Sequence, residues 1–131
     1  ELGGLSIVVG LALIDVLQAY GVMDVGFKWP NDIYVGTRKI CGILIQNSLN
    51  RNALASSIVG IGVNVNQTIF SKDIPNPSSL QLENGKEYDF YEMTIPIFSL
   101  DKQKVYVELN HSCGALCGNG KGIFAIFRAW L

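Results

Sequence analysis

Eight consecutive residues, 59–66, alternate strictly between branched apolar side chains and glycine or asparagine. The apolar set is Val59, Ile61, Val63 and Val65, and the other set is Gly60, Gly62, Asn64 and Asn66. Because successive side chains of a strand point to opposite faces, this run predicts a strand with one apolar face. Its other face is bare backbone that ends in two carboxamides. Glycine inside a strand often marks a place where a ligand or another backbone comes close.

Two neighbouring segments repeat this pattern. In a strand predicted over Val25–Trp29, Gly26 and Lys28 share the face opposite Val25, Phe27 and Trp29. In a strand over Lys39–Asn47, one alternating set is Ile40, Gly42, Leu44 and Gln46, and the other is Cys41, Ile43 and Ile45. Three glycine-containing strands with a lysine and an asparagine on matching faces predict the floor of a pocket for a flat, anionic small molecule. The alternative is that the glycines make room for a helix packed on the sheet.

Lys28 favours the pocket. A buried ammonium group costs several kcal/mol unless it is paired, so a lysine between Phe27 and Trp29 is rarely a core residue. It is either a surface lysine at a sheet edge or a fixed cation that faces a carboxylate or phosphate. Pro30 restrains the preceding Trp29 to an extended backbone, which favours the fixed cation.

The order of predicted elements indicates an α+β fold with a mixed, largely antiparallel sheet packed by helices. A helix at Leu5–Tyr20 stops at Gly21, and Trp29–Asp32 is predicted as a type I turn with proline at its second position. Gly36-Thr37 fits a two-residue type II′ hairpin, and Leu49–Asn52 fits a second turn. The remaining predictions are strands at Ile33–Val35 and Ala53–Asn66, a loop at Gln67–Ser79, a helix at Glu87–Asp101 interrupted by Pro96, a strand at Lys104–Val107 and a glycine-rich turn at Gly114–Gly122.

Composition excludes several classes of protein. A net charge of −1 over 131 residues argues against non-specific binding to nucleic acid. The apolar stretch Leu5–Ile14 is too short to span a bilayer. Three cysteines form an odd, sparse set, which suits a reducing, cytoplasmic compartment.

Three further features carry little chemistry. His111, Cys113 and Cys117 lack a fourth ligand and the usual zinc spacing, so no metal site is expected. Gly118–Gly122 lacks the Lys-Ser/Thr ending of a phosphate-binding loop and is expected to be a flexible turn. Asp32 beside Asn31 is expected to cap the turn rather than hold magnesium.

Three blocks resemble the catalytic domain of biotin protein ligases. Lys28–Tyr34 resembles its KWPND(I/L) motif, Gly42–Ile45 its glycine-isoleucine-leucine strand, and Gly60–Asn66 its GIGxNxN strand, in the same order and at similar spacing. The upstream Gly4-Leu5-Ser6 and the downstream Asn76–Leu80 resemble flanking segments. The resemblance covers residues 1–92 and implies part of that catalytic domain. Residues 93–131 form a C-terminal tail that does not align with the family.

The resemblance implies a ligase that activates biotin with ATP to biotinyl-5′-AMP. The ligase then transfers biotin to a lysine of a biotin carrier domain of a carboxylase. Mg²⁺ is expected to accompany ATP, and a homodimer is a possible assembly. It implies that Lys28 is catalytic and contacts the biotin carboxylate and the adenylate phosphate, and that Asn64 lies on the ATP side. The other binding positions that it implies are Trp29, Asn31, Gly42, Ile43 and Gly62.

The sequence also departs from the family. The glycine- and arginine-rich loop (GRGRRG type) and the segment that receives the biotin ring lie before the KWPND motif in the family. This chain begins 27 residues ahead of Lys28 and contains no counterpart of either. Gln46 stands where the family commonly has glutamate. We therefore expect an incomplete fragment that is inactive by itself. Two alternatives stay open: a lipoate ligase-like enzyme, and a non-catalytic remnant that acts as a binding module.

Overall fold

The computed structural model describes residues 3–89, 93, 106–110 and 122–130 of the chain. The helices are α1 (Gly3–Ala19) and α2 (Leu80–Asn84). The strands are β1 (Val25–Lys28), β2 (Asp32–Val35), β3 (Arg38–Asn50), β4 (Ala53–Asn64), β5 (Tyr106–Asn110) and β6 (Gly122–Trp130). The predicted α+β class is confirmed, and so are the first helix and the first four strands to within a few residues at each end.

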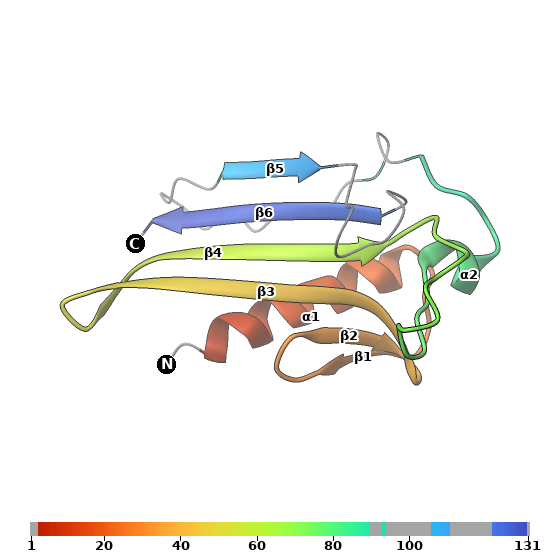
Figure 1. The fold of residues 1–131 in the computed structure, drawn as a ribbon, viewed down its shortest axis with the longest axis horizontal. Helices are drawn as coiled ribbons and strands as arrows, with labels where there is room; N and C mark the ends of the chain where they lie inside the picture. Colours follow the sequence, from red (N-terminus) through yellow and green to blue (C-terminus); the bar gives the residue numbers. More distant parts are fainter. Residues whose placement is uncertain (1–2, 90–92, 94–105, 111–121, 131) are drawn as a thin grey trace.

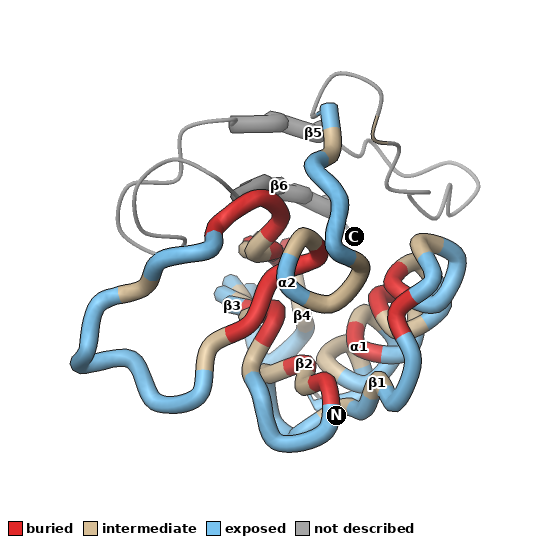
Figure 2. Tube along the Cα trace, turned by 90° about the vertical axis from the view of Figure 1, so that its right-hand side faces the viewer, coloured by how far each residue is buried: buried red, intermediate tan, exposed pale blue. Residues whose placement is uncertain are grey.

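The strands form one sheet in the order β1-β2-β3-β4-β6-β5, in which every neighbouring pair is antiparallel (Figure 1). The α1 helix lies against one face of this sheet (Figure 1), and Figure 2 shows buried residues both in the helix and in the strands. The core between them contains Leu13 and Leu17 of α1 and the buried residues Ile33, Val35, Cys41, Ile43, Ile61 and Val63 of the sheet. The apolar set of β4 therefore faces the helix, as the alternation predicts.

The turns follow from local chemistry. Gly36 has a φ of +56° and Val35 pairs with Arg38, which is the predicted two-residue hairpin with glycine first. At the far end of the long β3–β4 hairpin, Arg51 and Asn52 both have positive φ, as a type I′ turn requires. The turn after β1 is present, but the Trp29–Pro30 peptide bond is cis, which the predicted type I turn does not include.

A β-bulge changes the alternation at the start of β3. Ile33 pairs with Cys41 and Tyr34 pairs with Lys39, so that Ile40 is an extra residue with no partner on β2. Ile40 and Cys41 are both buried, at 0% and 1% exposure. The prediction that Ile40 shares a face with Gly42 is therefore wrong, because the bulge turns Ile40 into the core.

The segment after β4 differs from the prediction as well. The strand ends at Asn64 instead of Asn66, because the Val65 carbonyl accepts a hydrogen bond from the Gln81 amide of α2. Asn66 bonds the backbone of Tyr88 through both ends of its carboxamide. The short helix α2 begins directly after the predicted loop and was not predicted. Residues 87–89 and 93 are not helical, and the rest of the helix predicted over 87–101 lies outside the described residues.

The closest approach of helix and sheet occurs at a glycine of the helix. A Cβ atom on Gly10 would lie 2.8 Å from the Phe27 ring of β1. The strand glycines do not serve this purpose: Gly26 has nothing within 4 Å of its Cβ position, and Gly42 meets only Lys39 and Asp32 side chains. For these two glycines, the alternative that strand glycines make room for the helix does not hold.

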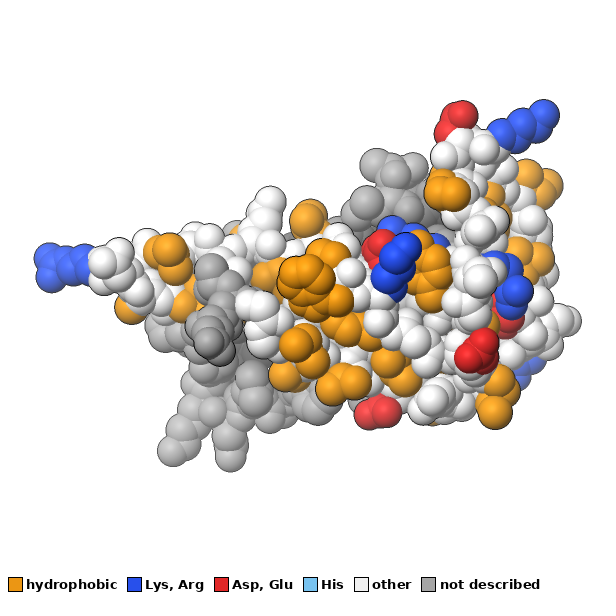
Figure 3. Space-filling model, turned by 90° about the horizontal axis from the view of Figure 1, so that it is seen from below, with side chains coloured by type: hydrophobic (Ala, Val, Ile, Leu, Met, Phe, Trp, Pro, Cys, Tyr) orange, Lys and Arg blue, Asp and Glu red, His pale blue; other side chains and the backbone are white. Residues whose placement is uncertain are grey.

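Several large apolar side chains of the described residues are exposed. Figure 3 shows hydrophobic side chains gathered over the middle of the face seen from below, with lysine, arginine and acidic side chains beside them. The α1 helix leaves Ile7, Val8 and Leu11 about half exposed. None of the described helices combines the length and the apolarity that crossing a membrane requires.

We predict that Gly10→Ala destabilises the protein, although alanine is a better helix former than glycine. The added methyl group overlaps the Phe27 ring and forces a shift that costs about 1–3 kcal/mol. Gly4→Ala in the same helix is the control, because its Cβ position has nothing within 4 Å and the change should be neutral or stabilising. Urea unfolding followed by circular dichroism measures both. A Gly10→Ala protein as stable as the parent would contradict the packing described.

Candidate functional site

The face of the sheet opposite α1 contains a continuous row of four residues from four strands. Lys28 pairs with Asp32, Asp32 with Gly42, and Gly42 with Gly62. Residues directly opposite in an antiparallel pair project on the same side of the sheet. This side, which we call the glycine face, therefore contains Lys28, Asp32, Gly42 and Gly62 in one row, with Asn64 two residues beyond Gly62.

An ion pair lies directly over the glycine in the middle of this row. Lys39 Nζ is 2.7 Å from Asp32 Oδ1, with 40% of the lysine side chain and 23% of the aspartate side chain exposed. A Cβ atom on Gly42 would lie 3.8 Å from Lys39 Nζ and 3.9 Å from Asp32 Oδ1. The pair thus lies beside bare backbone, and a Cβ atom at this position would be in ordinary van der Waals contact with it.

A second cation lies on the same face, nearer the sheet edge. Lys28 Nζ is 4.9 Å from the centroid of the Tyr34 ring, a cation–π distance. Tyr34 pairs with Gly26 on one side and with Lys39 on the other. Lys28 and Lys39 therefore both lie beside Tyr34, Lys28 through its contact with the ring and Lys39 through strand pairing.

Asn64 at the end of β4 is held by a neighbouring loop. Its Nδ2 donates a hydrogen bond of 3.1 Å to the carbonyl of Ser78. Ser78 is almost fully buried and belongs to the segment that runs beside the start of β3. The carboxamide of Asn64 is thereby fixed in orientation, so that its oxygen and its remaining N–H are presented in a defined direction.

The other predicted site residues have separate environments. Trp29 is 67% exposed and Asn31 is exposed, both in the turn between β1 and β2. The Ile43 side chain is buried in the core, and its amide donates to the Asn31 carbonyl at 2.7 Å. Only the main chain of Ile43 lies near the glycine face, while Lys28, Gly42, Gly62 and Asn64 share that face. His111, Cys113 and Cys117 lie outside the described residues.

Lys39 is the residue of this site that the sequence pattern missed. Strict alternation puts residue 39 on the same face as Cys41, which is the core. The bulge at Ile40 moves it to the face of Gly42, where it meets Asp32. The charge of Lys39 could have indicated its position, because lysine is rarely buried in a core and this lysine directly precedes a buried run.

Cys41 lies on the core side of the same strand. Burial raises the pKa of its thiol from 9.0 to about 12, an effect that the charge of Lys39 opposes and the charge of Asp32 reinforces. The thiol is therefore neutral and unreactive at physiological pH, and it has a packing role behind the glycine face.

The sequence matches a family model over residues 2–64, which include α1, the bulge and the whole of β4. That model describes the biotin/lipoate A/B protein ligase family. The match covers slightly less than half of the chain, and over this region the sequence is similar to that family. The matched range contains the row from Lys28 to Gly62, Lys39 and Asn64, so the whole glycine face lies within the region of similarity.

Curated relatives agree with this assignment. The chain is 34% identical over 82 residues to the bifunctional ligase/repressor BirA of Salmonella typhimurium, covering 63% of this chain and 26% of that protein. It is 34% identical over 104 residues to the biotin–[acetyl-CoA-carboxylase] ligase of Paracoccus denitrificans, covering 72% and 43%. It is 41% identical over 62 residues to the chloroplastic biotin–protein ligase 1 of Arabidopsis thaliana, covering 46% and 17%. The chain thus spans about a quarter of the Salmonella protein and less than half of the other two.

The buried thiol of Cys41 lowers the stability of the protein at alkaline pH. Between pH 9.0 and about 12 the thiol is protonated in the folded state and ionised in the unfolded state. The folded state then binds more protons, so stability falls as pH rises, by about 1.4 kcal/mol per pH unit from this group. We predict that Cys41→Ala removes this part of the slope in urea unfolding measured from pH 8.5 to 10.5. Parallel slopes in the two proteins would contradict the burial of the thiol.

Proposed function

We propose that this chain is part of a biotin protein ligase and that its glycine face binds the activated acyl-adenylate. The observation that supports this most strongly is the Lys39–Asp32 ion pair over Gly42, in a row with Lys28 and Gly62. Lys28 and Lys39 outweigh the single carboxylate of Asp32, and this excess of positive charge beside bare backbone suits a flat anionic ligand, which can lie against the strands and meet the cations at its phosphate. The names of the relatives supply biotin as the acid.

The proposed chemistry has two steps. In the first, a biotin carboxylate oxygen attacks the α-phosphorus of ATP, a P–O bond forms, and pyrophosphate leaves. In the second, the amine of a carrier lysine attacks the acyl carbon of the mixed anhydride, an amide forms, and AMP leaves. Negative charge concentrates at the carboxylate and the α-phosphate in the first step, and a preorganised cation there lowers the barrier.

Lys39 and Lys28 are the two cations proposed to meet this charge. Asp32 holds the Lys39 ammonium in place before the ligand binds, so little reorganisation is needed when the phosphate arrives. Lys28 projects over Tyr34 and approaches from the sheet edge, and it is proposed as the contact to the biotin carboxylate and the phosphate. Gly42, Gly62 and the Ile43 main chain provide the floor, and Trp29 and Asn31 form the rim.

Asn64 is proposed to lie on the ATP side of the ligand. Its carboxamide suits phosphate oxygens or a water bound to Mg²⁺, which would arrive with ATP and neutralise part of its charge. Asp32 is engaged by Lys39, and the described residues contain no cluster of three histidine, cysteine or acidic side chains. The proposal therefore assigns Mg²⁺ to the nucleotide and gives the protein no resident metal.

The proposed partner is the biotin carrier domain of a carboxylase, and the proposed location is the cytoplasm.

Lipoate is the competing acid, because the matching family includes both ligase types. The Trp29-Pro30-Asn31-Asp32 turn favours biotin. A direct comparison uses the stable alcohol-ester analogues of the biotinyl and lipoyl adenylates, in which a methylene group replaces the acyl carbonyl. Tighter binding of the lipoyl analogue would transfer the proposal to lipoate.

We predict that Lys39→Ala weakens binding of the biotinyl analogue by about ten- to a thousandfold, because it removes a fixed cation from the phosphate. Lys28→Ala is expected to lower adenylate formation by the same order in an enzyme that contains the complete domain. Isothermal titration calorimetry measures the first effect and pyrophosphate release with biotin and ATP measures the second.

Lys72→Ala is the matched control, because Lys72 is an exposed lysine of the loop between β4 and α2. Its removal changes the net charge equally and should leave both quantities unchanged. If the analogue does not bind the parent chain, or if Lys39→Ala behaves like Lys72→Ala, the glycine face is not the adenylate site.

A further inference from the structure

A segment that is distant in sequence completes the sheet beside Lys39. The Lys39 amide donates to the Asn76 carbonyl and the Ser78 amide donates to the Lys39 carbonyl, both at 2.8 Å. Lys39 and Pro77 thus form a parallel bridge. Residues 76–78 occupy the place beside β3 that β4 leaves when it ends at Asn64. The main chain of Lys39 is therefore held on this side by the segment and not by β4.

Ser78 joins three parts of the molecule. Its amide bonds β3 through the Lys39 carbonyl, its own carbonyl accepts from Asn64 at the end of β4, and its hydroxyl donates to Glu83 Oε1 in α2. The residue itself is 1% exposed, and its two side-chain-mediated bonds, to Asn64 and Glu83, are partly buried. Both Lys39 and Asn64 thus depend on where Ser78 sits.

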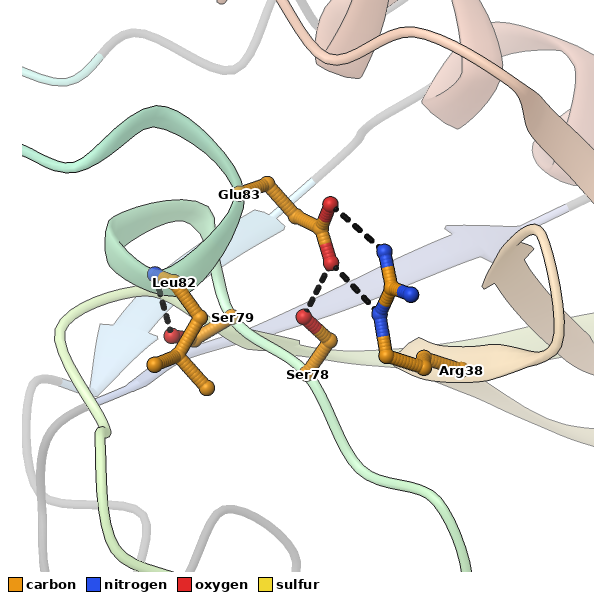
Figure 4. Close-up of polar contacts among 5 residues, drawn as sticks. All are labelled: Arg38, Ser78, Ser79, Leu82 and Glu83. Carbon is orange, nitrogen blue, oxygen red and sulfur yellow. Dashed lines mark hydrogen bonds and ion pairs between the residues drawn. The ribbon is translucent and has the colours of Figure 1, made fainter.

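Glu83 is fixed in turn by an arginine from the β2–β3 hairpin. Arg38 Nε donates to Glu83 Oε1 at 3.0 Å, and its NH2 group donates to Oε2 at 2.9 Å, a two-point contact shown in Figure 4. The glutamate side chain is 14% exposed and the arginine side chain is 49% exposed. Such bidentate pairs define geometry as well as charge. The pair connects α2 to the residue that directly precedes Lys39.

The helix that bears Glu83 is itself anchored. Ser79 caps it by accepting a 3.2 Å bond from the Leu82 amide, and Gly85 ends it with a φ of +71°. Leu80 is buried at 1% exposure. A five-residue helix has little stability by its own backbone bonds, so its position depends on these contacts and on the Arg38–Glu83 pair.

We propose that Arg38 and Glu83 are positioning residues of the glycine face. Their ion pair holds Ser78, and Ser78 sets the main chain of Lys39 and the carboxamide of Asn64. Neither charged residue is one of those that make up the face. The inference depends on the proposed function only for what Lys39 and Asn64 do with a ligand, and the coupling itself is measured without one.

The test is a double-mutant cycle of Arg38→Ala, Glu83→Ala and the double variant in the full chain. Amide hydrogen exchange at Lys39 and Ser78 is expected to rise about three- to tenfold in each single variant. The double variant should exchange at nearly the same rate as the singles, because the two residues act as one unit. Exchange at Ile43, whose amide donates to the Asn31 carbonyl and not to the 76–78 segment, should not change.

A spectroscopic signature separates positioning from general stabilisation. The side-chain amide resonances of Asn64 should shift in all three variants, and Glu83→Gln, which keeps an acceptor for the Ser78 hydroxyl, should retain most of their parent position. Glu87→Ala, which removes an exposed carboxylate beyond α2, is the control for charge and should leave the parent spectrum unchanged.

Four results would overturn the proposal. Amide exchange at Lys39 and Ser78 could stay at the parent rate, or it could rise by the same factor across the whole sheet. The effects of the two substitutions on the exchange rate could multiply to about ten- to a hundredfold in the double variant, or the Asn64 side-chain resonances could keep their parent positions. A failure of the proposed function looks different. The exchange pattern and the Asn64 shift would appear as expected, but the adenylate analogue would bind neither the parent chain nor any variant.

Discussion

The β-bulge at Ile40 is the constraint on which the arrangement of the glycine face depends. By inserting one residue opposite β2, it buries Ile40 and Cys41 together and brings Lys39 to the same side as Gly42. Without the extra residue, alternation would direct the Lys39 ammonium into the core, at a cost of several kcal/mol for an unpaired charge. The bulge therefore supplies both a well-packed core and a cation at the floor of the proposed site.

Much of this architecture could be predicted from the sequence, because its signals are local. The alternation at residues 59–66 predicted which side of β4 packs on the helix, and Gly36-Thr37 predicted the hairpin. The same period-two argument predicted that Lys28, Gly42 and Gly62 lie on matching faces of their strands, and the pairing of the strands then brings them into one row. Each of these predictions depends on residues that are adjacent or two positions apart, where backbone geometry determines the outcome.

The parts that could not be predicted depend on contacts between distant residues. The position of Lys39 needs the pairing of β2 with β3, and the bridge from Lys39 to Pro77 joins segments almost forty residues apart. The short α2 helix has no clear periodicity, and it is held by a cap, a buried leucine and the Arg38–Glu83 pair. A loop between β4 and α2 gives no sequence signal for such docking, since its polar composition is typical of any surface loop.

The central claim is that an acyl-adenylate binds the glycine face and not the apolar side of the sheet covered by α1. Two-dimensional ¹H–¹⁵N spectra of the labelled chain, recorded during titration with the stable biotinyl-adenylate analogue, test this claim most directly. The account predicts that the largest backbone shifts occur at Gly42, Gly62 and Asn64, with small changes at Leu13 and Leu17 in the helix. Shifts concentrated in α1, or no shifts at saturating analogue, would contradict it.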